Sequence, residues 1–81
     1  MDFNKGDFGV QVGAFKEQSN ALRLQEKLLK EYSGVRILER ERSGETFFLV
    51  RLTQCKQLDE ALRLQKLLEE KGYTQTFVVA E

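Results

Sequence analysis

The stretch FGVQVGAF, at residues 8–15, carries one amide side chain between two glycines. Along a β-strand successive side chains point to opposite faces, so Gly9, Gln11 and Gly13 share one face and leave it nearly bare. An amide both donates and accepts hydrogen bonds, and glycine lets a ligand come close to the strand backbone. This spacing indicates the binding of a polar ligand on the face of a sheet.

A second stretch, FFLVRLT at residues 47–53, supplies groups that complement the amide. Alternation places Phe47 and Arg51 on one face, where the ring stacks on a ligand ring and the guanidinium forks onto a carboxylate. With Gln11 and Gly13 they suit an elongated, hydroxyl-rich ligand. Structural interpretations stay open for all of them. The glycines would mark a bulge, Gln11 would be solvated, Phe47 would cap the core, and Arg51 would have a surface partner.

The composition excludes several classes of site. The 81 residues include 13 basic and 13 acidic side chains, no histidine and a single cysteine, Cys55, which we interpret as a small buried apolar residue. No internal disulfide can form, and neither a metal site nor a cofactor is expected. A net charge of zero argues against a nucleic-acid-binding domain. The 81 residues contain neither a signal-peptide pattern nor an apolar run of about 18 residues, so we expect a soluble domain without membrane insertion, and targeting segments of a longer protein would lie outside it.

Both strands belong to an internal repeat with an offset of 40 residues. The pentapeptide ALRLQ occurs at 21–25 and again at 61–65, and the same offset aligns Leu28 with Leu68. Two copies are too few for a solenoid. The repeat therefore predicts one domain whose halves are related by a pseudo-twofold axis.

Each half is expected to contain one helix, over about residues 19–32 and 59–71. Ser19 and Asp59 are the expected N-caps, and Gly72 ends the second helix because glycine readily adopts the left-handed conformation. Apolar residues at i, i+3 and i+7 form one stripe on each helix. The stripes consist of Ala21, Leu24 and Leu28, and of Ala61, Leu64 and Leu68.

The two remaining strands are expected at 35–42 and 75–80, with Ser43-Gly44 as a hairpin turn into the third strand. The order βαββαβ with right-handed crossovers gives an α+β, ferredoxin-like or RNP-like fold. In this fold both helices cover one face of a four-stranded sheet, and the other face is open. The side chains expected beneath the helices are Phe8, Val10, Val12, Phe48, Val50 and Leu52.

We expect a lead-in at residues 1–6, followed by one domain at 7–81 with half-repeats at about 8–41 and 47–80. The second strand ends in the alternating run ERER at 39–42. We interpret this run as a solvated edge-strand device that opposes aggregation, because charges on an edge discourage further strand pairing.

The sequence resembles the SPOR domain, a sporulation-related repeat of bacterial cell-envelope and division proteins. The resemblance covers about residues 7–80 and is most specific in VQVGAF at 10–15, with support from KGY at 71–73. It implies the fold described above, which is similar in topology to RNA-recognition modules. It also implies a non-catalytic module that binds peptidoglycan, in particular glycan strands stripped of their stem peptides.

The resemblance further implies an extracytoplasmic, often septal, location within a larger protein, and we expect a monomer. Gln11 matches the first-strand glutamine of the family, and Ala14 stands where a small residue, often serine, lines the site. Phe47 and Arg51 match an aromatic residue and an arginine of the third strand. With Gly13, these four residues are the predicted ligand-binding set, and no catalytic or metal-binding residue is predicted.

The sequence departs from the family pattern at three places. Leu49 stands where many members have a basic residue, Thr53-Gln54-Cys55 replaces a Gly-Pro-aromatic ending, and Ala14 lacks the hydroxyl of serine. We expect these differences to change the affinity for the ligand or the ligand preference rather than the fold.

Other functions remain as alternatives. A protein-interaction or small-ligand regulatory module of the same topology would follow if the departures abolish glycan binding. An RNA-binding module is a further alternative, because GETFFLV at 44–50 is similar to the third strand of RNA-recognition modules. Catalysis of glycoside cleavage is not expected, since the open face offers no pair of carboxylates.

Overall fold

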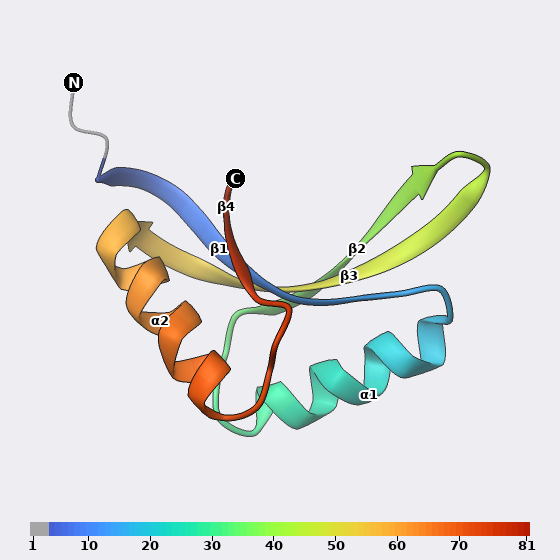
Figure 1. Ribbon diagram of the computed structural model, residues 1–81, viewed down its shortest axis with the longest axis horizontal. Coiled ribbons are helices and arrows are strands. Elements are labelled where there is room, and N and C mark those ends of the chain that lie inside the picture. The colour runs from blue at the N-terminus through green and yellow to red at the C-terminus, as the bar shows by residue number, and fades with distance from the viewer. Residues whose placement is uncertain (1–3) are drawn as a thin grey trace.

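The structure, a computed structural model, describes residues 4–81 apart from the side chain of Gln54. Its elements are β1 (Lys5–Phe15), α1 (Gln18–Leu29), β2 (Val35–Arg42), β3 (Glu45–Gln57), α2 (Leu58–Glu70) and β4 (Phe77–Ala80). The four strands form one antiparallel sheet in the order β2-β3-β1-β4. The sheet is curled, and both helices lie on the same side of it (Figure 1). The predicted α+β fold is confirmed.

The core lies between the sheet and the two helices. Of the six side chains predicted to lie there, Val10, Val12, Val50 and Leu52 are at most 5% exposed, and Phe8 and Phe48 pack against them half-buried. Both helix stripes are buried in the same way. Ala21 and Ala61 are fully buried, as is Leu68, and Leu28 is 2% exposed.

The glutamine that ends each copy of the pentapeptide joins its helix to the strand that follows. The side-chain amide of Gln25 donates to the carbonyl of Val35 at 3.1 Å, and that of Gln65 donates to the carbonyl of Thr76 at 2.9 Å. Both bonds are part-buried, so each one fixes where the next strand begins. The repeat therefore extends to a polar contact that apolar periodicity does not reveal.

The N-caps expected at Ser19 and Asp59 are wrong. The N-cap positions are Glu17 and Gln57, and neither makes a side-chain capping bond. The first two backbone N–H groups of α2 instead donate to the backbone and side-chain oxygens of Asn4, at 2.7 and 3.0 Å. A cap supplied by the start of β1 satisfies these N–H groups from a distant part of the chain, so local sequence does not show it.

The predicted turns are confirmed. Gly72 has a φ of +103°, and the chain leaves α2 there. Ser43 and Gly44 both have positive φ values, 53° and 81°, as a two-residue type I′ hairpin requires. The last strand is shorter than expected, since β4 begins at Phe77 rather than at residue 75.

Candidate functional site

A β-bulge in β1 determines which residues reach the open face, the side of the sheet away from the helices. Gln11 lies opposite Arg51, but the next pair joins Gly13 to Val50. Val12 is therefore an extra residue in β1, and the alternation of side chains shifts by one position beyond it. Simple alternation from the sequence is valid only up to Gln11.

The placement of Gly13 on the open face is therefore wrong. A Cβ atom at Gly13 would lie 2.8 Å from the ring of Phe15 and 3.2 Å from Leu24 of α1, so this position faces the helix layer. Ala14 takes its place on the open face, opposite Leu49 of β3. Ala14, which the family resemblance indicated, is thus on the open face. Gly13, which strand alternation indicated, is not.

Gly9 allows a close contact with the backbone of β3 and does not leave free space for a ligand. A Cβ atom there would lie 2.8 Å from the carbonyl oxygen of Leu52 and 2.7 Å from a carboxylate oxygen of Glu81. The register of β1 against β3 is also irregular at this point. The interpretation of both glycines as bulge residues, which the sequence left open, is the one that the structure supports.

Gln11 is not a solvated surface residue. It is 8% exposed, between Arg51 of β3 and Phe77 of β4, its two cross-strand neighbours. The Nε atom of Arg51 donates to Gln11 Oε1 at 3.1 Å, so the amide oxygen is directed toward the guanidinium. The two side chains hold one another in place at the centre of the sheet.

Three of the five predicted residues line one groove of the open face. Gln11, Ala14 and Phe47 lie around a hollow of about 540 Å³. The other lining residues are Arg40, Glu41, Arg42, Leu49 and Phe77. Neither Arg51 nor Gly13 lines this groove, although Arg51 contacts it through Gln11. The groove combines an apolar floor with an amide and basic side chains.

The charged run of β2 is sorted between the two faces of the sheet. Arg40 lies opposite Phe47, whereas Glu39 lies opposite Phe48, a residue that packs against the core. Because directly paired residues point to the same face, the arginines at even positions share the open face and the glutamates do not. The open-face arginines of β2 are Arg36, Arg40 and Arg42. The interpretation of ERER as a device against aggregation did not predict these open-face arginines. The alternation of glutamate and arginine in ERER indicates that all its arginines lie on one face.

The open-face arginines lack acidic partners within residues 4–81, where the side chain of Gln54 is not considered. No ion pair there includes Arg36, Arg40, Arg42 or Arg51. Arg36 even lies directly opposite Arg51, and like charges so placed destabilise a sheet. A chain with a net charge of zero thus has a locally basic surface.

A sequence profile of the SPOR domain matches residues 4–80. The chain belongs to the SPOR-domain family. Among solved structures, the SPOR domain of RlpA from Pseudomonas aeruginosa matches with a TM-score of 0.78 and 28% sequence identity, over 91% of this chain and 99% of that one. A search of curated protein sequences gives no match. Family membership and this structural match support a peptidoglycan-binding module of cell-envelope and division proteins.

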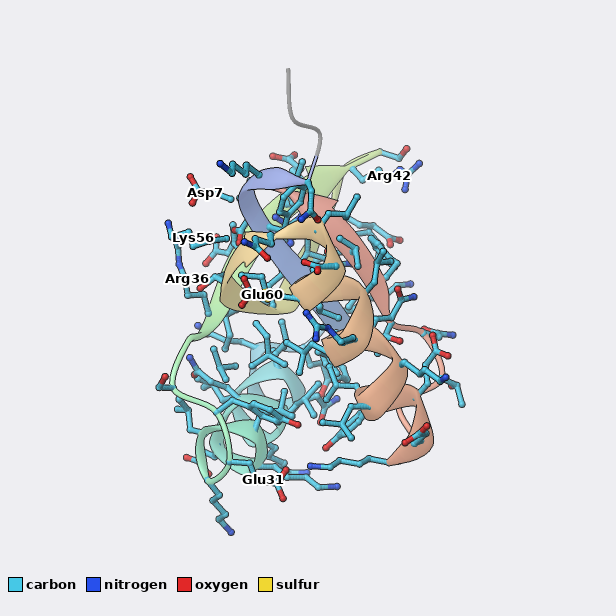
Figure 2. The ribbon with its side chains drawn as sticks, turned by 90° about the vertical axis from the view of Figure 1, so that its left-hand side faces the viewer. Asp7, Glu31, Arg36, Arg42, Lys56 and Glu60 are labelled. Atoms are coloured by element: carbon cyan, nitrogen blue, oxygen red, sulfur yellow. The ribbon has the colours of Figure 1, made fainter. Side chains whose placement is uncertain are left out.

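The opposite end of the open face of this SPOR domain has mixed charge. Asp7 pairs with Lys56, and both line a hollow with Arg36 and Glu81. Figure 2 shows Asp7, Lys56 and Arg36 together on one side, and Arg42 away from them on the other. The uncompensated basic groups of the groove are therefore those near the β2–β3 hairpin.

Two residues of the departure from the SPOR pattern at 53–55 have structural roles. The hydroxyl of Thr53 donates to the carbonyl of Gly34 at 3.1 Å. Cys55 is 8% exposed and belongs to the core, so its interpretation as a buried residue is confirmed. Burial, with Glu60 and Glu81 nearby, raises the pKa of the Cys55 thiol and so disfavours the reactive thiolate.

Within the described residues, no group of three or more carboxylate or thiol side chains is arranged to hold a metal ion. In that same part of the chain, neither helix has the length and apolarity to span a bilayer.

Proposed function

We propose that this SPOR domain binds, as a monomer, peptidoglycan glycan strands that lack stem peptides. In this proposal the groove on the open face is the binding site, and the domain directs the larger protein that carries it to the cell wall or septum, outside the cytoplasm. The domain itself carries out no catalysis. The ligand-binding residues of the groove are Gln11, Ala14 and Phe47, and Arg51 acts through its hydrogen bond to Gln11. Gly13 contributes only by leaving room for the ring of Phe15.

The observation that carries the proposal is the convergence of Gln11, Ala14 and Phe47 on one groove. They come from two different strands, and the sequence predicts each of them as a ligand-binding residue. Phe47 offers an aromatic face for a sugar ring, Gln11 offers an amide for hydroxyl groups, and Ala14 leaves room between them.

The preference for stripped strands follows from steric fit and charge. The groove is bordered by Arg40 and Arg42 on one side and by Phe77 on the other. A strand with stem peptides is bulky at every other sugar, so it clashes with these borders. A stripped strand is slim and has a free lactyl carboxylate at the same positions, which basic side chains favour.

Co-sedimentation with purified sacculi tests the proposal, using sacculi before and after treatment with an amidase that removes the stem peptides. We expect the domain to pellet more strongly with treated sacculi, and Phe47→Ala to lose most of this binding. Leu62→Ala is the control, because Leu62 is 49% exposed on α2, away from the open face. Equal pelleting before and after treatment would contradict the peptide-free preference, and full binding by Phe47→Ala would exclude the groove.

A further inference from the structure

We infer that Arg40 and Arg42 of β2 bind successive carboxylates of the glycan and thereby make its recognition depend on charge. This inference rests on the proposed function, and it assigns the anion-binding role to an edge strand rather than to the central arginine, Arg51.

The register of the sheet gives the two arginines a common direction. Arg40 lies opposite Phe47, Arg42 lies two residues further along the same strand, and both line the groove. Residues at i and i+2 of a strand are about 7 Å apart and point to the same face. The two guanidinium groups therefore form a short row along one border of the groove, above an apolar floor.

Among the described side chains, neither arginine of this row takes part in an ion pair. Glu45, directly opposite Arg42, pairs with Lys16 at 3.4 Å. Arg40 Nη1 donates to the backbone carbonyl of Glu39 at 3.4 Å, which leaves its charge unpaired with any acid of the described residues. Glu41 also lines the groove, but its pairing with Thr46 directs its side chain toward the other face. Both arginines are exposed, so a ligand reaches their guanidinium groups without breaking an ion pair of the described part of the chain.

Arg51 is less suited to this role. Its Nε atom already donates to Gln11 Oε1 at 3.1 Å, and Arg51 does not line the groove. We therefore assign Arg51 as a positioning residue that orients the Gln11 amide. The anion-binding groups are Arg40 and Arg42.

A permutation of the charged run tests this assignment without changing composition or net charge. The variant combines Glu39→Arg, Arg40→Glu, Glu41→Arg and Arg42→Glu, which moves the cations to the opposite face. All four positions are exposed, so we expect the fold and its thermal stability to persist. The ligands are soluble amidase-stripped glycan strands and the same strands after their carboxyl groups are converted to neutral amides.

We expect the wild-type domain to prefer the charged strand by about 2- to 25-fold, since each exposed ion pair contributes about 1.4- to 5-fold. This preference decreases as salt rises, and it is absent in the permuted variant. A matched comparison removes two charges at a time. Arg40→Gln with Arg42→Gln loses the preference, whereas Arg23→Gln with Arg63→Gln, on the exposed surfaces of the helices, retains it.

Four outcomes would overturn the inference. The first two are a preference for the charged strand that survives the permutation, and a loss of that preference in the helix double variant equal to the loss in the Arg40 and Arg42 double variant. The other two concern the wild-type domain: equal binding of the charged and neutral strands, and tighter binding of single-stranded RNA than of the stripped glycan. If wild type binds both strands equally and Phe47→Ala abolishes binding, the proposed function stands and only this inference fails. If wild type binds neither strand, both fail.

Discussion

The two halves of the molecule are nearly identical where they build the core and different where they face outward. The burial pattern along 21–30 is the same, residue for residue, as that along 61–70. On the open face, by contrast, β2 contributes three arginines and β4 contributes the exposed Phe77. Packing keeps the repeat because both halves fill equivalent space beneath one sheet. In the proposed function, the open face differs because one asymmetric ligand needs different groups on its two borders.

The comparison is clearest where the halves meet. Gln11 and Arg51 are 40 residues apart, so they occupy equivalent positions, and they are hydrogen-bonded to each other. Glu31 and Lys71 are also 40 residues apart and pair at 2.6 Å. A residue near a pseudo-twofold axis contacts its own equivalent, and two identical charges there would repel. The complementary pairs Gln11–Arg51 and Glu31–Lys71 can form only because the two halves carry different residues at these equivalent positions.

The largest expected effect on stability concerns the equivalent core leucines of the two halves. Leu28→Ala and Leu68→Ala should each lower the free energy of unfolding by ~2–5 kcal/mol, because both side chains are almost fully buried. Urea denaturation measures the loss. The exposed control Leu62→Ala should change stability by less than about 0.5 kcal/mol. A loss at one leucine as small as that of the control would show that the halves do not share the core equally.

The next effect separates the two glycines that flank Gln11. Gly9→Ala should cost ~1–3 kcal/mol, because the new Cβ would lie 2.8 Å from the backbone oxygen of Leu52. Gly13→Ala should cost less, since its nearest contact is the ring of Phe15, whose side chain can shift. Thermal unfolding of both variants checks the order. The reverse order would contradict the assignment of a backbone contact to Gly9.

The smallest effect concerns the repeated glutamines. Gln25→Ala and Gln65→Ala each remove one part-buried hydrogen bond to a strand carbonyl and should cost ~0.5–1.5 kcal/mol. The two losses should be similar, as the equivalent geometry requires. Denaturant titration of both variants sharpens the comparison. A marked loss at only one of them would mean that the bond matters in one half alone.

The fold could be predicted because its signals are local and occur twice. Alternating strands, apolar helix stripes and the Ser43-Gly44 turn each specify their element without reference to distant residues. The N-caps could not be predicted in this way, because Asn4 caps α2 from the start of β1.

The candidate site was predicted only in part, for a similar reason. One inserted residue, Val12, exchanges Gly13 for Ala14 on the open face, and alternation alone cannot locate a bulge. The arginines of β2 were missed because their face is set by the register against β3. Register depends on pairing between strands, so composition alone shows a neutral chain and not a basic groove.

The central claim is that the groove of the open face binds the glycan, and NMR chemical-shift mapping tests it most directly. Amidase-stripped glycan strands are titrated into the isotope-labelled domain, and the backbone amide signals are followed. The largest shifts should occur at Gln11, Ala14, Arg40 and Phe47, with little change along the exposed surfaces of α1 and α2. Shifts confined to the helices, with these four signals unmoved at saturation, would contradict the claim.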